Sequence, residues 1–406
     1  MYSILENRKN GMKEEILDFM KELIKTPSES LKEKDISEIV YKKMTELKYN
    51  KVFKDDAGNV IGLILGRESD PTILLNSHLD TVSASSASDI YSPRILDGKL
   101  YGNGASDCKS GLAAQIFAGA LLRRCMLPLR GNLIVAATVA EQNGVSLGIR
   151  ELIAKTLPDI GLTPKYAILG EPTNMGLYYG HDGWVKIDIR MESAKPAHLN
   201  RAVSSIFSDF RTNFANRMHV NSLEEFAMSE PVYEGGSGSG NSANIIVAKR
   251  LRANEAAGNA IGIMEHEIGL LGEKMRSVAV NVNVLREEQK LYTGSTRIVQ
   301  HITNAWASDP YSPVMERARH ALSAAGCKVT TGKWELGRLG MGTAGSVLTG
   351  EFNIPTIGYG PGDESMAHMA KEGVDINNIY EAAYGNASII HSLIGIPVCG
   401  WTSDDI

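Results

Sequence analysis

The first third of the chain alternates between helical and strand-like patterns of apolar residues. From residue 13 to 47, apolar side chains recur every three or four positions in two runs separated by Pro27, and this spacing predicts two helices. A run of small residues at 111–123 predicts a third helix. Short apolar runs predict strands at 51–53, 60–65, 72–75 and 132–139. This alternation is typical of an α/β domain with a mainly parallel sheet.

A different pattern occupies the middle of the chain. Apolar and polar side chains alternate at 184–191 and 278–284, as in a sheet with one exposed face, and 202–218 has the spacing of an amphipathic helix. Residues 233–244 are rich in Gly and Ser and predict a loop, whereas the stretch from there to 274 has a helix-like pattern.

The first pattern resumes after residue 311. Helices are predicted at 314–325 and 376–393, and strands at 328–330 and 354–359. We therefore predict a second domain, residues 181–296, inserted into a first domain formed by residues 1–180 and 297–406. The length of 406 residues agrees with two domains, because single cores stop growing at roughly 250–300 residues.

Composition excludes several classes of protein. A net charge of −5 argues against a nucleic-acid binder and leaves small molecules as the expected partners. No apolar run reaches the roughly 20 residues that a membrane helix needs. The N-terminal residues do not resemble a signal peptide, and the four cysteines are widely spaced, so a cytoplasmic protein with free thiols is expected.

Five segments place possible metal ligands where predicted strands end or a helix begins. In LLNSHLDTV a carboxylate could orient a metal-bound imidazole, and in YGNGASDCKSG a carboxylate at a helix start could bridge two cations. TVAEQNG ends a strand with two polar side chains, one of which could act on a water. ILGEPT and GYGPGDESMAH complete the set. Each segment alone is more often a turn, a helix cap or solvated surface. The candidate residues are His78, Asp80, Asp107, Glu141, Gln142, Glu171 and His368.

In order, spacing and local sequence, these segments resemble the M20 metallopeptidases, which include aminoacylases, succinyl-diaminopimelate desuccinylases, acetylornithine deacetylases and carboxypeptidase G. The resemblance spans nearly the whole chain and is strongest in SHLDTV, YGNGASD, ILGEPT and GYGPGDE-x-x-AH. It implies an α/β fold, with a mainly parallel-sheet zinc-peptidase catalytic domain and an inserted α+β, ferredoxin-like lid and dimerisation domain. It also implies a homodimer.

The resemblance implies a role for each of these residues. His78 and Glu171 would hold one zinc, Asp107 would bridge, and His368 would hold the second zinc. Asp80 would orient His78, and Glu141 would be the general base.

The main departure from the family pattern is Gln142, which stands where a second adjacent glutamate normally binds metal. A neutral amide in place of this glutamate removes one negative charge from the site. We therefore expect one or two Zn²⁺ ions per chain, or Co²⁺ or Mn²⁺ in place of Zn²⁺. An alternative register makes Glu141 the ligand and puts Ala140 in place of the base, although the 34-residue step from Asp107 to Glu141 favours the first register. Ala344, where an Asp or Asn is usual, and Cys108, after the bridging Asp, are lesser departures.

Three residues of the inserted domain complete the expectations. His198, in SAKPAHLNRAVSSI, resembles the family histidine that reaches across a dimer interface to stabilise the oxyanion, although a core or surface histidine is the alternative. Asn244, in GNSANII, resembles a substrate-binding segment whose proline is missing here, and Arg286 is a weaker candidate. Hinges are expected near 180–183 and 294–306.

The expected function is hydrolysis of an amide or peptide bond in a small substrate that carries a carboxylate. The competing hypothesis is a degenerate, non-catalytic binding protein, for which Gln142 and Ala344 would be the signs. An oxidoreductase or nucleotide binder is not favoured, because YGNGAS matches neither G-x-G-x-x-G nor a phosphate loop.

Overall fold

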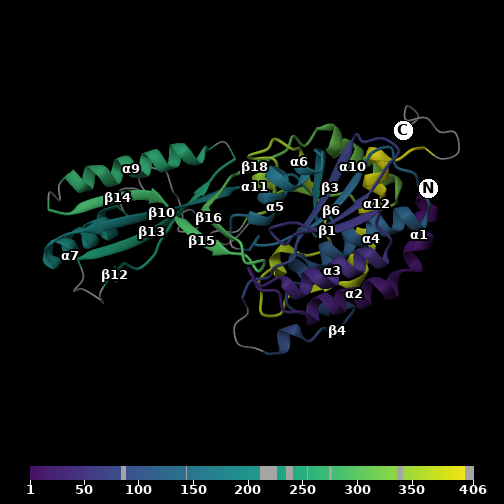
Figure 1. The fold of residues 1–406 in the computed structure, drawn as a ribbon, viewed down its shortest axis with the longest axis horizontal. Coiled ribbons are helices and arrows are strands. Elements are labelled where there is room, and N and C mark those ends of the chain that lie inside the picture. Colours follow the sequence, from purple (N-terminus) through teal and green to yellow (C-terminus); the bar gives the residue numbers. More distant parts are fainter. Residues whose placement is uncertain are drawn as a thin grey trace.

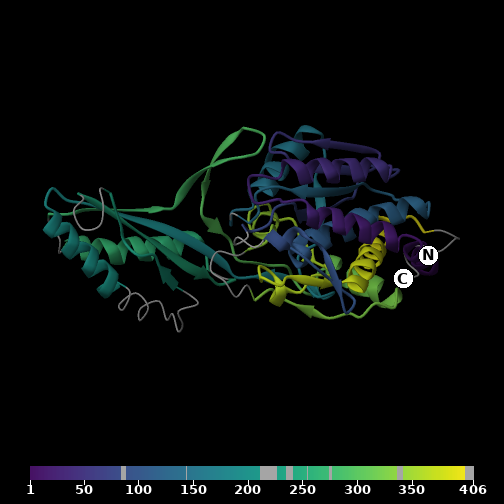
Figure 2. The ribbon, with the colours of Figure 1, turned by 90° about the horizontal axis from the view of Figure 1, so that it is seen from below.

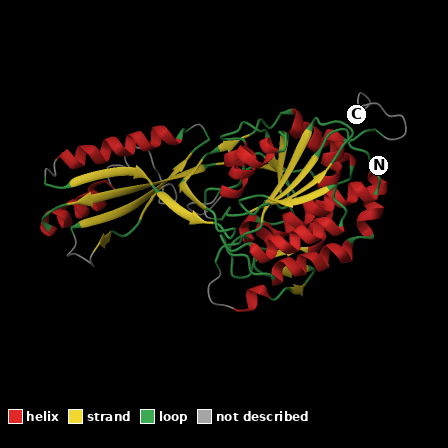
Figure 3. Ribbon diagram, viewed as in Figure 1, coloured by secondary structure: helices red, strands yellow, loops and turns green. Residues whose placement is uncertain are grey.

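The structure, a computed structural model, describes residues 1–83, 88–142, 144–210, 226–234, 241–253, 255–273, 277–335 and 342–397. The strands form two groups, which lie one after the other along the longest axis of the molecule (Figures 1 and 3). We call the larger group with its helices the main body, and the smaller one with its helices the lid.

The main body is built on an eight-stranded sheet. Its order is β1 (Lys51–Lys54), β2 (Val60–Ile64), β6 (Leu133–Thr138), β3 (Thr72–His78), β7 (Pro164–Leu169), β20 (Thr356–Gly358), β8 (Leu177–Tyr178) and β19 (Thr331–Gly332). The four central strands, from β6 to β20, pair in parallel. Their carboxyl ends therefore meet at one edge of the sheet.

Helices cover both faces of this sheet because its central strands are buried on both sides. In β3, Ile73 and Leu75 face one core and Leu74 faces the other. The first core includes α1 (Tyr2–Asn10), α2 (Lys13–Lys25), α3 (Lys34–Glu46), α4 (Ser110–Arg124), α10 (Pro313–Ala324) and α12 (Ile376–Ile394). The second core includes α5 (Leu147–Glu151), α6 (Leu157–Asp159) and α11 (Gly345–Leu348).

The lid is an antiparallel sheet with two helices on one face. Its order is β11 (Phe226–Met228), β13 (Ser242–Leu251), β10 (Gly183–Glu192) and β14 (Ala279–Val284), and β12 (Val232–Glu234) also pairs with β13. Alternate residues of β10, from Val185 to Met191, pack against α7 (Pro196–Ser205) and α9 (Ala257–Glu273). These features and those of the main body confirm the predicted fold class.

Short elements complete the chain. A three-stranded sheet is formed by β4 (Arg94–Leu96), β5 (Lys99–Tyr101) and β21 (Gly373–Asp375). Short 3₁₀ turns lie at Ser88–Tyr91 and Glu364–Met366, and π-helical turns at Ala105–Lys109, Leu152–Thr156 and Ile206–Phe210. No helix among the described residues is both long enough and apolar enough to span a bilayer.

Two adjacent segments join the lid to the main body where the hinges are predicted. Strand β9 (Gly180–His181) pairs with β18 (Trp306–Ala307), and β17 (Ile302–Thr303) pairs with the start of β10. A Cβ on Gly180 would lie 2.3 Å from the main-chain oxygen of Trp306, so this close crossing requires a glycine. The chain thus crosses between the two parts at residues 180–183 and again at residues 302–307, and the division into domains at residues 181 and 296 stays a prediction.

A β-hairpin forms a third connection between the two parts. Strands β15 (Arg286–Lys290) and β16 (Thr296–Gln300) leave the lid and reach back to the main body, as Figure 2 shows. At its tip Leu291 is 1% exposed within the core of the main body, and the Tyr292 hydroxyl donates to the Gly58 carbonyl over 2.9 Å. Arg297 forms two 3.0 Å bonds with Glu151. The hairpin is therefore an anchored arm.

We expect Tyr292→Phe to lower the free energy of unfolding by about 1 kcal/mol or slightly more, because it removes a hydroxyl that lies 2.9 Å from the Gly58 carbonyl and 3.1 Å from Ser37 Oγ. The ring and its packing against Gly58 stay, so only the hydroxyl is tested. Urea unfolding measures the change. Tyr311→Phe is the control, because Tyr311 is 76% exposed and its replacement should change nothing. Equal stability of all three proteins would mean that the tip is not anchored by this bond.

Four sequence predictions need correction. Helix α1 is missing from them, because its apolar residues do not follow a clear helical period. The helix-like stretch up to 274 contains strand β13, whose apolar side chains on both faces hide the strand period. Among the described residues of this stretch, α9 is the helical part. The predicted helix at 202–218 begins earlier, at Pro196, and its part beyond 210 lies outside the described residues. The strand predicted at 328–330 lies at Thr331–Gly332.

Candidate metal centre

The parallel strands bring four of the predicted ligand segments to one edge of the main sheet. His78 is the last residue of β3, Glu141 and Gln142 follow β6, Glu171 follows β7, and His368 lies in the loop after β20. Asp107 comes from the turn before α4. Side chains beyond the carboxyl ends of adjacent parallel strands converge, which is why such edges form binding sites.

One ligand atom from each of four buried side chains lies within 4.8 Å of the others: His78, Asp107, Cys108 and Glu171. His78 Nε2 is 3.2 Å from Asp107 Oδ1 and 3.8 Å from Glu171 Oε2. Imidazole nitrogen and carboxylate oxygen are the ligands that Zn²⁺ and similar cations take. This half of the cluster therefore has the composition of a metal site.

The other oxygen of Asp107 faces a second pair of side chains. His368 Nε2 lies 2.8 Å from Asp107 Oδ2, and Gln142 Nε2 donates to the same oxygen over 2.9 Å. Asp107 thus stands between two groups of possible ligands, one on each carboxylate oxygen. The Gln142 amide presents its nitrogen in this arrangement, and turning it by 180° would present its oxygen instead.

Glu141 has the properties of a general base. It is 6% exposed and lies beside the cluster, where Ser146 Oγ donates to its Oε1 over 3.3 Å. Burial raises the pKa of Glu141 to about 7. A base is most effective when its pKa lies near the working pH, so the environment suits proton transfer near neutrality.

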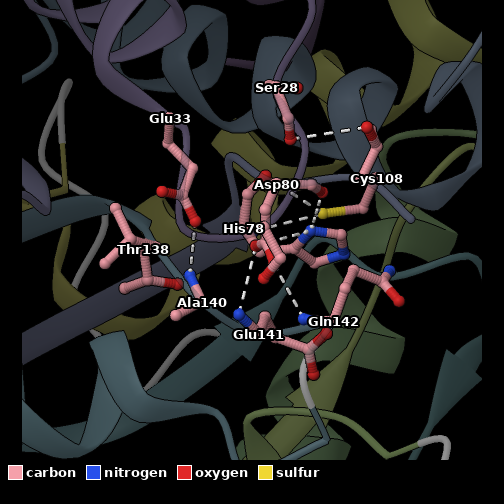
Figure 4. A network of polar contacts seen from close by, with 12 residues as sticks. Ser28, Glu33, His78, Asp80, Cys108, Thr138, Ala140, Glu141 and Gln142 are labelled. Carbon is pink, nitrogen blue, oxygen red and sulfur yellow. Dashed lines mark hydrogen bonds and ion pairs between the residues drawn. The ribbon is translucent and has the colours of Figure 1, made fainter. Parts of the chain in front are cut away.

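Asp80 holds the turn that carries Glu141 and Gln142. Its two carboxylate oxygens accept the N–H groups of Glu141 over 3.1 Å and of Gln142 over 2.8 Å (Figure 4). His78 Nδ1 is 2.7 Å from the Asp80 main-chain oxygen and 3.6 Å from its carboxylate. Asp80 therefore orients the imidazole mainly through its backbone and uses its carboxylate on the neighbouring turn.

The charges of the cluster suit a bound cation. Burial raises the pKa of Glu171 well above its usual value, and Asp107 and Glu141 add to this shift although His78 opposes it. Burial also opposes ionisation of Asp107, but His368 and His78 outweigh it and hold its pKa well below the usual value. Crowded buried carboxylates are unfavourable without a counter-charge, which a divalent cation would supply.

Cys108 is close enough to be a ligand but is engaged elsewhere. The His78 main-chain N–H donates to its sulfur over 3.2 Å, and burial raises the pKa of its thiol to about 12. Only the thiolate binds metal well. The Cys108 sulfur also lies 3.7 Å from the His78 carbonyl, so its hydrogen bonds are to the backbone of β3, whereas the histidines and carboxylates of the cluster contact one another through their side chains.

The structure does not bring His198 and Asn244 to this cluster. His198 lies in the first turn of α7, and α7 lies in the part of the lid that is farther from the main body (Figure 1). Asn244 lies seven residues along β13 from Leu251, the partner of Gly183, which is roughly 23 Å at the usual rise of a strand. Its side chain donates to Asp188. Arg286 begins the arm, and Ala344 is buried at the start of α11.

Two carboxylates that support the cluster are missing from the sequence predictions. Glu372 accepts the N–H groups of Gly104, Ser106 and Asp107 over 2.8–2.9 Å, and so fixes the turn that carries Asp107. Glu33 accepts the N–H of Ala140. A glutamate four residues after His368 was the available signal for Glu372. Nothing in the local sequence distinguishes Glu33 from a helix-start acid.

Comparisons with known proteins agree with this geometry. The profile of Peptidase family M20/M25/M40 matches residues 74–392. The putative LysW-lysine/LysW-ornithine hydrolase of Pyrococcus furiosus is 26% identical over 91% of this chain and 94% of its own. The structure of a tripeptidase from Staphylococcus aureus has a TM-score of 0.67 at 19% identity, covering 93% of this chain and 97% of its own. A Bacillus subtilis protein, YXEP, titled a dinuclear metal-binding M20 peptidase, has a TM-score of 0.66 at 12% identity, covering 94% and 98%.

The fold and the cluster together define a metal-dependent hydrolase with a lid domain. More specifically, the chain belongs to peptidase family M20/M25/M40, whose profile matches most of its length. It is an enzyme that hydrolyses peptide or amide bonds.

Proposed function

We propose that this enzyme hydrolyses the amide or peptide bond of a small substrate that carries a carboxylate, such as an N-acyl amino acid or a dipeptide. The observation that carries the proposal is the position of Glu141, buried beside the ligand cluster with its pKa raised to about 7. The hydrolase of Pyrococcus furiosus, whose name refers to lysine and ornithine, and the tripeptidase of Staphylococcus aureus support this substrate class.

The residues of the site divide the work. His78 and Glu171 would hold one cation, and His368 and the Gln142 oxygen would hold a second. Asp107 would contact both cations. We propose that the cations are Zn²⁺, with Co²⁺ or Mn²⁺ as alternatives. Such cations supply positive charge that favours deprotonation of water and polarises a carbonyl. Glu141 accepts the proton of the attacking water and passes it to the leaving nitrogen. The Asp80 carboxylate keeps Glu141 in place by accepting its main-chain N–H.

Elemental analysis of the purified protein, combined with assays on a panel of N-acyl amino acids and dipeptides after restoring each metal, tests the proposal. Two metals per chain with turnover would support the dinuclear hydrolase, and one metal with turnover would mean that a mononuclear site suffices. Absence of metal and of turnover under every condition would contradict the proposal. The non-catalytic alternative has no support in the site, since the base and all the carboxylate and histidine ligands are gathered.

We expect Gln142→Glu to tighten binding of the more weakly held cation by about 10- to 100-fold, the range that changes beside metal ligands commonly produce. The added carboxylate would lie next to Asp107 Oδ2, where Gln142 Nε2 is now 2.9 Å away. Calorimetric titration of metal into the metal-free protein measures the change. The control is wild-type protein titrated in parallel. Unchanged affinity would show that Gln142 does not contact the second cation.

We also propose a homodimer formed through the lid. His198 and Asn244 lie too far from their own metal ligands to act there, so a partner's site is where they would serve. Strand β14 stands at an edge of the lid sheet, and α9 beside it exposes Ile263 by 42% and Leu270 by 38%. Sedimentation velocity should give the mass of two chains; the mass of one chain at micromolar concentration would contradict the dimer.

We propose that the enzyme acts in the cytoplasm. The support is that Cys108, Cys125 and Cys327 are all free thiols, as expected in a reducing compartment, while Cys399 lies outside the described residues.

A further inference from the structure

Three consecutive main-chain N–H groups hold the turn that carries the base. The N–H of Ala140 donates to Glu33 Oε1 over 2.9 Å, and those of Glu141 and Gln142 donate to Asp80 (Figure 4). Glu33 comes from the chain just before α3, 107 residues before Ala140. Two buried carboxylates from distant segments thus bind one short stretch of backbone.

The bond from Ala140 compensates for an unfavourable backbone conformation. Ala140 has a φ of +52°, in the left-handed region, which a residue with a Cβ rarely adopts. The Ala140 carbonyl also accepts the Leu147 N–H over 3.1 Å, so the bond from Glu33 holds the N–H side of a residue that is already held on its carbonyl side. The side chain of Glu141 follows directly from it, so a rotation at Ala140 would swing the base away from the ligand cluster.

Glu33 is buried in a way that stability alone does not explain. It is 0% exposed, and its Oε1 also accepts the N–H of Leu31 over 2.9 Å. Its Oε2 is buried and has no hydrogen-bond partner among the described residues. A buried polar atom without a partner is unfavourable and needs a compensating role. In the same segment, Ser30 Oγ donates to Asp80 over 2.6 Å, so residues 30–33 support both carboxylates.

The geometry points to Glu33 as a positioning residue of the hydrolytic reaction: it fixes the Ala140 peptide so that Glu141 projects toward the metal ligands. The inference rests on the proposed function, in which Glu141 is the base. Glu33 touches neither substrate nor cation, and it acts only through the turn. Its loss should therefore affect the rate of the chemical step more than the binding of substrate.

The test compares Glu33→Ala, which removes the acceptor, with Glu33→Gln, which keeps a carbonyl oxygen for the Ala140 N–H. We expect Glu33→Ala to lower kcat by about 100-fold, the effect of a misplacement of about 1 Å. KM should stay within about threefold, because ground-state binding is not changed. Glu33→Gln should recover most of the rate. Ile36→Ala, which removes a buried side chain of α3, the helix that follows Glu33, controls for lost stability.

A second readout does not depend on turnover. Hydrogen–deuterium exchange of the peptide that spans residues 139–147 should be roughly tenfold faster in Glu33→Ala than in wild type, Glu33→Gln or Ile36→Ala, because the local opening becomes easier. Unchanged exchange in Glu33→Ala, or a fall in kcat no larger than in Ile36→Ala, would overturn the inference. If wild type cleaves none of the panel, the proposed function fails, and exchange alone decides whether Glu33 holds the turn.

Discussion

Replacement of Glu141 by glutamine should lower kcat by about 10³-fold or more, within the range that a general base contributes. Glutamine has nearly the same shape, so the turn held by Asp80 should persist, but it cannot accept a proton from water. Metal content should remain that of wild type, because the ligands lie on other residues. Steady-state kinetics on the best panel substrate and elemental analysis of the same sample measure both quantities.

The same variant decides between the two alignments of this segment with the family pattern, in which Glu141 is either the base or a metal ligand. If Glu141 were a ligand, its replacement would reduce metal content together with activity. Ser146→Ala is a matched control: it removes the 3.3 Å contact to Glu141 Oε1 and leaves the carboxylate, so its rate should stay within about tenfold of wild type. Retention of most activity by Glu141→Gln would exclude this residue as the base.

Asp107→Ala should abolish binding of both cations and, with it, turnover. The carboxylate lies between the two ligand groups, at 3.2 Å from His78 Nε2 and 2.8 Å from His368 Nε2. Without it, each group keeps too few anionic ligands for a divalent ion. Metal content after dialysis and kcat should both fall to background, a loss of at least about 10³-fold in rate.

Loss of the fold must be excluded in this variant. Asp107 is 6% exposed, and its main-chain N–H is held by Glu372, a contact that alanine keeps. Circular dichroism should therefore match metal-free wild type, which is the correct reference. Full metal content in folded Asp107→Ala would contradict the bridging position. Loss of one metal only would assign Asp107 to a single cation.

The sequence predicts the main body better than the lid. Strands β3 and β6 are continuous apolar runs buried on both faces, and their pattern has one interpretation. Strand β13 also has apolar side chains on both faces, yet it lies in a half-exposed sheet and follows a Gly/Ser-rich segment. Its sequence therefore lacks the alternation of apolar and polar residues that would distinguish it from the helix α9 that follows. The arm was also hidden, because its anchoring depends on contacts that are distant in sequence, such as that of Tyr292 with Gly58, 234 positions away.

The site shows the same division. Residues that end strands, such as His78 and Glu171, are predictable from local sequence, because the strand itself determines where they point. Glu33 and Glu372 act through backbone N–H groups of turns that are distant in sequence, and no local pattern records such bonds. The roles of Glu141 and Gln142 stay predictions, since a position beside the ligand cluster measures neither proton transfer nor metal binding.

The arm limits how freely the lid can be exchanged between relatives. A lid grafted at the two hinge crossings alone would bring either its own hairpin or no hairpin. In either case the position that Leu291 occupies in the core of the main body would be wrongly filled. A compatible graft would have to include the receiving surface as well, namely Gly58, Asp56 and Glu151. The two parts of this enzyme are therefore joined as a matched pair, and an exchange of the lid requires changes in the main body as well.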